Sequence, residues 1–188
     1  TGRFVEKKGL IYALMAFKAV REKFKCFEFR IIGSGPCQNE IETYIRDNNI
    51  QDFVRLLGFL SYEEYLEEMQ GADIFIHPSV EARDGGSEGG APTTILEAQA
   101  SGMPVLSTYH ADIPNIVVPG KSALLSKERD VSGLVENITF LLENQHKWRE
   151  MGEAGRAFVE QYHDIRNEVK HLEAHYAMLI GVGSEVTC

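Results

Sequence analysis

Strand-like apolar segments alternate with amphipathic helical segments along most of this chain. The run at 73–77 is short and largely apolar, which is typical of a strand buried on both faces. The alternation predicts an α/β fold with one doubly wound, mainly parallel, Rossmann-like sheet and helices on both faces. The expected strands are 3–5, 27–33, 54–59, 73–77, 104–107 and 123–125, and the expected helices are 9–24, 39–48, 62–69, 92–101, 131–143, 147–162 and 165–179.

The length of 188 residues, with 44% hydrophobic and 25% charged residues, fits a single domain over 1–188 that ends in a helix at 163–180. No run approaches the roughly 20 apolar residues of a membrane helix, so we expect no transmembrane segment. Three cysteines, Cys26, Cys37 and Cys188, form no CxxC pair, which favours a reducing, cytoplasmic location.

Charge is distributed unevenly along the chain. Residues 1–60 carry 10 Lys and Arg against 7 Asp and Glu, whereas residues 61–188 carry 9 against 21. The acidic total argues against nucleic-acid binding, and the positive excess near the start suits a small anion.

Ligands of such sheets bind beyond the carboxyl ends of the strands, which here are the loops 6–9, 33–36, 59–61, 78–92 and 108–114. Gly33 and Gly35 let the backbone approach a ligand, but no third glycine completes a dinucleotide fingerprint, so a dehydrogenase is disfavoured. A tight strand-to-helix turn explains these glycines equally well. Arg3 and Lys8 flank the first turn and could bind one anion of two phosphates, or be two solvated cations.

The segment from Glu88 to Glu97 is more informative, because a glycine-rich loop leads directly into a helix. The first amides of that helix, at Thr93 and Thr94, have no intrahelical partner and form an anion site together with the helix dipole. Glu88 and Glu97 bracket the site, where carboxylates can accept hydrogen bonds from the hydroxyls of a ribose or a hexose. Each could instead be an exposed surface residue.

Metal binding is not expected. His171 and His175 are four residues apart on the last helix, but no third ligand accompanies them. His77, at the end of a strand, is better placed for catalysis, although a structural role fits it as well.

Taken in order, these motifs resemble the C-terminal domain of family 4 glycosyltransferases, a retaining group with the two-domain GT-B fold. Each motif alone is weak, and the ordered set is specific. The combination of Glu-Gly-Gly-Ala-Pro with Ser-Gly-Met-Pro is similar to transferases that assemble cell-surface polysaccharides. The motifs lie at 2–9, 33–36, 57–60, 77–79, 88–98 and 102–105.

The resemblance implies a role for each matching residue. Arg3 and Lys8 would hold the diphosphate of a nucleotide-sugar donor, Glu97 the ribose hydroxyls, and Glu88 the hydroxyls of the transferred sugar. The remaining donor contacts would come from Gly33, Gly35, Phe59 and Leu60 near the base and from Ala91, Pro92, Thr93 and Thr94 near the sugar and phosphate. The acceptor would be a glycan or a lipid-linked sugar, and no metal cofactor would be required.

Two departures from the family pattern stand out. Glu88 and Glu97 are separated by one residue more than is usual, which leaves Glu81 as a rival for the sugar-contacting glutamate. Asn115 stands where the family is often acidic.

The resemblance also implies an N-terminal acceptor domain before Thr1, without which we expect this chain to fold and bind nucleotide but transfer little sugar. That domain could attach the protein peripherally to a membrane. Two alternatives remain open: a nucleotide-sugar epimerase of GT-B architecture, and a non-catalytic nucleotide-binding module.

Overall fold

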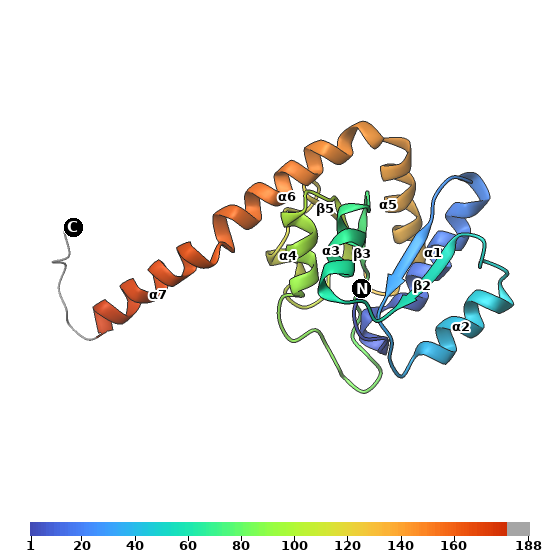
Figure 1. Cartoon of the computed structure of the whole chain (residues 1–188), viewed down its shortest axis with the longest axis horizontal. Helices are drawn as coiled ribbons and strands as arrows, with labels where there is room; N and C mark the ends of the chain where they lie inside the picture. Colours follow the sequence, from blue (N-terminus) through green and yellow to red (C-terminus); the bar gives the residue numbers. More distant parts are fainter. Residues whose placement is uncertain (180–188) are drawn as a thin grey trace.

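The computed structural model describes residues 1–179, in which parallel strands are flanked by helices (Figure 1). The strands are β1 (Phe29–Ile32), β2 (Val54–Gly58), β3 (Phe75–His77), β4 (Val105–Thr108) and β5 (Ala123–Ser126). The helices are α1 (Leu10–Lys23), α2 (Gln38–Asp47), α3 (Tyr62–Gln70), α4 (Thr93–Ala100), α5 (Val131–Glu143), α6 (Trp148–Tyr162) and α7 (Ile165–Leu179), with short 3-10 helices η1 (Glu6–Lys8), η2 (Ile113–Asn115) and η3 (Gln145–Lys147). The predicted α/β class is confirmed. Cys188 and the last residue of the predicted helix 163–180 lie outside the described residues.

The strands form two sheets, so the prediction of one continuous sheet was wrong in this respect. β1 pairs with β2, and β3, β4 and β5 pair in that order, with every pairing parallel. A cavity of about 640 Å³, lined by Ile31, Phe75, Ile76 and other side chains, lies between the facing edges of β1 and β3. Among the described strands, no ladder joins β1 to β3.

The predicted first strand, 3–5, belongs to neither sheet. Its neighbourhood is extended and makes strand-like contacts with the end of β1: Gly2 N donates to Ile32 O at 2.9 Å, and Phe4 N donates to Ser34 O at 2.8 Å. These contacts place the segment next to β1 on the side away from β2, which is the position of the central first strand in a doubly wound sheet. Two bonds on one side are too few to form a ladder, and this is why the strand prediction failed.

Three apolar clusters join the helices to the strands. One packs Leu14 of α1 against β1 and α2, a second packs α1 against α5 and β4, and a third packs Ile95 of α4 against β3, β4 and β5. Ile95 and Leu14 are completely buried, and burial of each such side chain contributes about 1.5 to 3 kcal/mol. This packing fixes the strand ends from which the site loops emerge.

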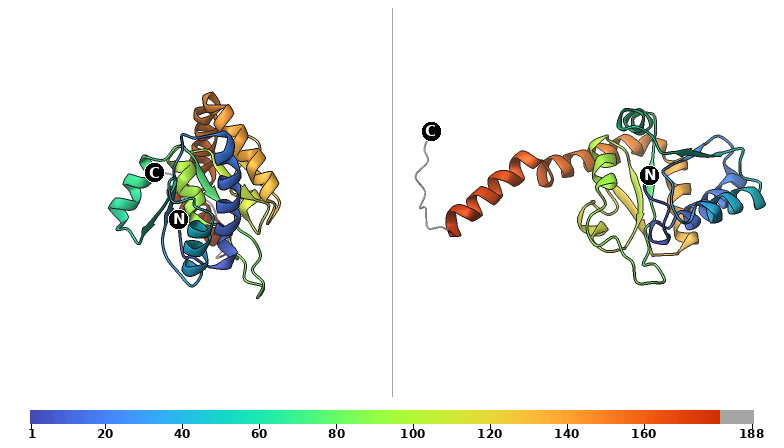
Figure 2. Two further views of the ribbon diagram at one scale, coloured as in Figure 1. Left: turned by 90° about the vertical axis from the view of Figure 1, so that its right-hand side faces the viewer. Right: turned by 60° about the horizontal axis from the view of Figure 1, so that its bottom comes forward.

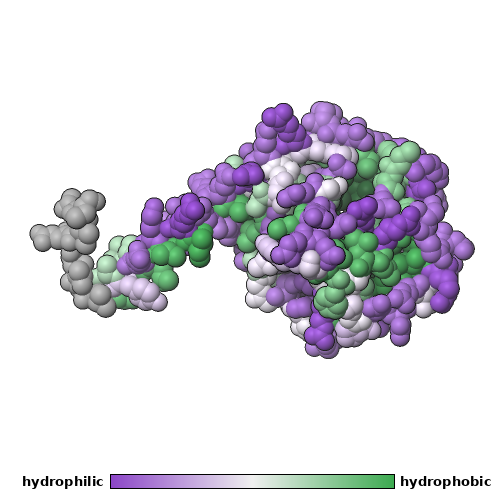
Figure 3. All heavy atoms as spheres, in the orientation of Figure 1, coloured by the Kyte–Doolittle hydropathy of each residue, from purple (hydrophilic) through white to green (hydrophobic). Residues whose placement is uncertain are grey.

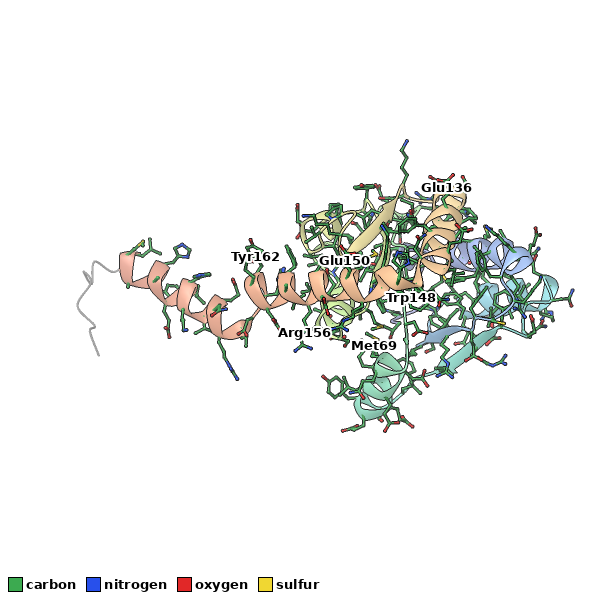
Figure 4. The ribbon with its side chains drawn as sticks, turned by 90° about the horizontal axis from the view of Figure 1, so that it is seen from above. Met69, Glu136, Trp148, Glu150, Arg156 and Tyr162 are labelled. Carbon is green, nitrogen blue, oxygen red and sulfur yellow. The ribbon has the colours of Figure 1, made fainter. Side chains whose placement is uncertain are left out.

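The C-terminal helices leave the body of the protein. α6 starts next to the body at Trp148 and extends to Tyr162 (Figure 4), and α7 projects further outward in the right-hand view of Figure 2. Hydrophobic residues follow one side of α7 in Figure 3. Ile165, Val169 and Leu172 of α7 are among the exposed hydrophobic side chains. Within residues 1–179, no helix has the length and apolar character needed to cross a membrane.

Candidate functional site

The candidate site lies where the loops after the parallel strands meet the start of the chain. The loop from Pro78 to Pro92, at the bottom of Figure 1, runs from β3 to α4 and passes next to η1. Val80 N donates to Lys7 O at 2.9 Å, and Lys7 Nζ donates to Ser87 O at 2.7 Å. These two bonds bring the predicted loops 6–9 and 78–92 together.

Glu88 and Lys8, predicted separately, form a direct ion pair. Lys8 Nζ lies 2.9 Å from Glu88 Oε2, and Ser79 Oγ donates to Glu88 Oε1 at 2.8 Å. His77 Nε2 is 3.6 Å from the same Oε1, beyond hydrogen-bond length, and is buried with no hydrogen-bond partner among the described residues. The Glu88 side chain is only 6% exposed, so the pair is well shielded from water.

The surroundings of Glu88 keep it ionised. Burial alone would raise its pKa, but the contacts with His77, Lys8 and Ser79 outweigh burial and lower the pKa to about 2. Burial lowers the pKa of His77 by more than the nearby Glu88 carboxylate raises it, so His77 is neutral near pH 7. At that pH the cluster therefore contains a carboxylate, an ammonium and a neutral imidazole.

The pKa of Glu88 predicts a specific acid sensitivity. Because this pKa is about 2 in the folded protein and 4.5 for the ordinary side chain, the cluster contributes stability above about pH 4.5 and loses it as the pH falls toward 2. We expect the free energy of unfolding of Glu88→Gln, measured with urea, to fall less steeply than that of the wild type over this range. Glu81→Gln, which changes an exposed carboxyl in the same loop, should follow the wild type. Equal slopes for Glu88→Gln and the wild type would contradict the assignment.

Glycines hold the chain start against the site. A Cβ on Gly33 would lie 2.0 Å from Gly2 O, and one on Gly35 would lie 2.5 Å from Phe4 O. A Cβ on Gly9, where φ is +62°, would lie 1.9 Å from Pro78 O. Packing therefore explains why glycine stands at positions Gly33 and Gly35, because only glycine allows the segment that carries Arg3 to pack this closely.

Arg3 is exposed and lines a small hollow together with Lys8 and His77. In the part of the chain that the structure describes, no ion pair uses the Arg3 guanidinium. Lys8 has three donors, of which Glu88 takes one. Both cations can therefore still donate to an anion.

The N-terminus of α4 lacks a side-chain cap. Pro92, predicted in the first turn, is the N-cap residue, and its side chain has no acceptor for the amides of Thr93 and Thr94. Thr94 Oγ1 is buried and has no hydrogen-bond partner among the described residues. Ala91 comes directly before this N-cap and is half-buried. These groups fit the anion site that the sequence predicts at this helix end.

Glu97 lies on the same helix with a different partner. Tyr65, on α3, donates its hydroxyl to Glu97 Oε2 at 2.6 Å. Burial, followed by the hydrogen bond to Glu97, raises the pKa of Tyr65, so the phenol stays protonated and orients the carboxylate. Sequence reasoning missed Tyr65, because nothing in the helix pattern indicates which side chain reaches α4.

The loop that carries Glu88 has a second attachment, which the sequence analysis also missed. His110 Nδ1 lies 2.6 Å from Glu128 Oε1, and Glu88 N donates to His110 Nε2 at 3.2 Å. Glu81 contacts this attachment through its backbone, since its N donates to Glu128 Oε2 at 2.8 Å. The Glu81 carboxylate takes part in none of the described ion pairs, whereas the Glu88 carboxylate pairs with Lys8. His110 falls in the predicted loop 108–114, and that position was the only signal for it.

The remaining candidates lie near the edges of the site. Phe59 follows β2 and is 81% exposed, and Leu60 beside it is half-buried. Asn115 lies in η2, where its Nδ2 donates to Asp112 Oδ1 at 2.7 Å.

Over residues 1–179, no group of three or more His, Cys, Asp or Glu side chains is arranged to hold a metal ion. No hydrogen bond or ion pair described for 1–179 joins Glu97 to Lys8 or Glu88, so the two glutamates belong to separate clusters.

Comparison with known proteins gives the family. Residues 1–158 match the family model described as glycosyl transferases group 1. The amylovoran biosynthesis glycosyltransferase AmsK of Erwinia amylovora is 37% identical over 158 residues, which are 84% of this chain and 39% of that protein. The chain spans less than half the length of the curated relatives it matches first.

Solved structures share the fold. The Anabaena Alr3699/HepE structure, in complex with UDP and glucose, aligns with a TM-score of 0.80 at 19% identity, over 94% of this chain and 46% of that one. The C-terminal domain of the group 1 glycosyl transferase LpcC from Francisella tularensis aligns with a TM-score of 0.76 at 19% identity, over 88% of this chain and 84% of that domain. The fold is that of GT-B glycosyltransferase neighbours, and the family match extends over most of the chain. The chain therefore belongs to the group 1 glycosyl transferase family.

Proposed function

We propose that this chain binds the nucleotide-sugar donor of a glycosyltransferase that, as a longer protein, transfers a sugar with retention of configuration to a glycan or lipid-linked acceptor. The observation that carries the proposal is the pairing of Lys8 with Glu88 beside Arg3, at the edge of the sheets where the uncapped N-terminus of α4 also lies. The relative AmsK is named for amylovoran biosynthesis, and this supports a role in assembling a polysaccharide.

The site chemistry fits a diphosphate with a sugar on one side and a ribose on the other. Arg3 and Lys8 would donate charge-assisted hydrogen bonds to the diphosphate, and the amides of Thr93 and Thr94 would add the positive end of a helix. Such donors stabilise the negative charge that develops on a leaving nucleoside diphosphate, so the chain's own groups can supply this function without a required metal. The similar HepE structure is a complex with UDP and glucose, and this supports a nucleotide-sugar donor for this chain.

The two glutamates would contact hydroxyls on either side of the diphosphate. Glu88 is ionised and next to Lys8, so its oxygens can accept hydrogen bonds from the transferred sugar. Glu97 is exposed, and Tyr65 orients its carboxylate toward the vicinal hydroxyls of a ribose. Gly33, Gly35, Phe59 and Leu60 would border the base.

Calorimetric titration of the chain with UDP, GDP, ADP and CDP tests donor binding, and we expect at least one of them to bind. If none binds, the proposal is wrong for this chain. Transfer requires an assay of the longer protein with donor and acceptor. An epimerised sugar formed from donor alone would favour the epimerase alternative, and nucleotide binding without turnover would favour a non-catalytic module.

We propose a cytoplasmic location, where nucleotide sugars are the donors.

A Tyr65→Phe variant tests the role of Glu97. Loss of one hydrogen bond, worth about 0.5 to 1.5 kcal/mol, should weaken binding of the nucleoside diphosphate by about 2- to 12-fold. Affinity for inorganic diphosphate should not change, because that probe has no ribose. Tyr62→Phe, on an exposed tyrosine of the same helix, is the matched control and should bind both probes as the wild type does. Equal loss for both probes in Tyr65→Phe would refute the ribose assignment.

A further inference from the structure

An imidazole and a carboxylate attach the Glu88 loop to the strand ends. His110 follows β4 and is 4% exposed, and its Nδ1 lies 2.6 Å from Glu128 Oε1 beyond β5. On the other side of the ring, Nε2 accepts from Glu88 N at 3.2 Å and lies 3.1 Å from Ser87 Oγ. The ring therefore bridges the backbone of Glu88 to a carboxylate on a different strand end.

The same carboxylate attaches the other end of the loop. Glu81 N donates to Glu128 Oε2 at 2.8 Å, and Arg129 donates to Glu81 O. Between these attachments the loop contains glycines and no helix or strand. The bond to His110 therefore attaches the loop backbone at Glu88, whereas Lys8 binds the Glu88 side chain.

The geometry also fixes the protonation state of the ring. Glu88 N can only donate, so Nε2 must be an acceptor and Nδ1 must carry the proton that it donates to Glu128. Burial alone would raise the pKa of Glu128, but hydrogen bonds from Glu81 N and His110 outweigh burial and lower it, which keeps the acceptor ionised. The charged and titratable groups around the ring are Glu128 and Arg129 after β5, and Glu88 in the loop with Lys8 and His77 around its carboxylate.

We propose that His110 is a positioning residue for donor binding: its Nε2, in the tautomer set by Glu128, holds the backbone of Glu88 so that the Glu88 carboxylate meets Lys8. The expected effect on donor affinity rests on the proposed function, whereas the contact between His110 and Glu88 N does not.

Two substitutions test the contacts of His110 Nδ1 and Nε2 separately. In His110→Gln the side-chain amide reaches as far from Cα as Nε2 does, so its oxygen can accept from Glu88 N and does not titrate. In His110→Asn the amide reaches only as far as Nδ1, so it can contact Glu128 but not Glu88 N. A merely structural requirement for a polar side chain would not distinguish these variants.

The experiment measures two properties of each variant: the hydrogen-exchange protection factor of the Glu88 amide by NMR, and the affinity for the nucleoside diphosphate that binds the wild type most tightly. For His110→Asn we expect protection to be lost and affinity to fall about 3- to 10-fold. His110→Gln should keep both close to wild type.

The outcomes separate this inference from the proposed function. Unchanged Glu88 protection in His110→Asn overturns the positioning role, whatever the nucleotide result. Lost protection with unchanged nucleotide affinity overturns the link to the donor. If the wild type binds no nucleotide, the proposed function fails on its own terms, and the exchange data still decide whether His110 holds Glu88.

Discussion

Replacing Arg3 and Lys8 together by alanine should abolish measurable nucleoside diphosphate binding. Each charge-assisted hydrogen bond to a phosphate contributes about 1.5 to 3 kcal/mol, so loss of both should weaken affinity on the order of 100- to 10,000-fold. Lys8 contributes twice, because its removal also leaves the buried Glu88 carboxylate without its cation, next to the bound anion. Calorimetric titration measures the effect directly.

The control for this double variant removes the same net charge elsewhere. Lys121 and Lys170 are exposed, and neither takes part in an ion pair among the described residues, so Lys121→Ala with Lys170→Ala changes the overall charge equally. We expect this control to bind nucleotide as the wild type does. If Arg3→Ala with Lys8→Ala binds equally well, while circular dichroism shows it folded, the diphosphate is held elsewhere.

The sequence predicted most helices closely, because their ends are marked by local chemistry. α3 begins with a capping box: Ser61 Oγ accepts from Glu64 N, and Glu64 accepts from Ser61 N. Helices 131–143 and 165–179 were predicted with the observed bounds. The first of them begins where Asp130 accepts a hydrogen bond from Gly133 N. Such signals lie within one turn of the chain and can be read without tertiary contacts.

Strand pairing and side-chain partners were harder to predict from the sequence. The segment 3–5 has strand-like residues, but whether it joins a sheet depends on what lies beside it, and the structure leaves a cavity between β1 and β3. The sequence indicated Lys8 and Glu88 as separate candidates, yet their ion pair spans 80 residues and exists only because η1 meets the β3 to α4 loop. Tyr65 and His110 act through contacts of the same long-range kind.

The largest expected effect on stability is at Gly152, where α6 crosses the end of α4. A Cβ on Gly152 would lie 1.8 Å from Gly102 O and 2.6 Å from Gly102 C, both backbone atoms that cannot rotate away. Gly102 itself has φ of +79°, in the turn that ends α4. Gly152→Ala must therefore separate the two helices.

The sign of the change in stability of Gly152→Ala shows whether the helix–helix contact or the helix propensity of alanine dominates. On helix propensity alone, Gly→Ala within a helix should stabilise by roughly 0.5 to 1 kcal/mol. The clash should instead destabilise by about 3 kcal/mol, which would lower the melting temperature by roughly 6 to 12 °C for a domain of this size. Gly155→Ala should cost less, because its Cβ would meet the Gln99 side chain at 3.0 Å. Glu153→Ala, on an exposed residue of α6, should be nearly neutral.

The same substitution should reach the candidate site, because α4 carries both Glu97 and the uncapped amides of Thr93 and Thr94. If α6 holds α4 in place, Gly152→Ala should weaken nucleotide binding even at temperatures where the variant is fully folded. Urea unfolding together with calorimetric titration at 10 °C measures both properties. A stabilised Gly152→Ala would contradict the close helix contact, and a destabilised variant with wild-type affinity would show that α4 holds its position without α6.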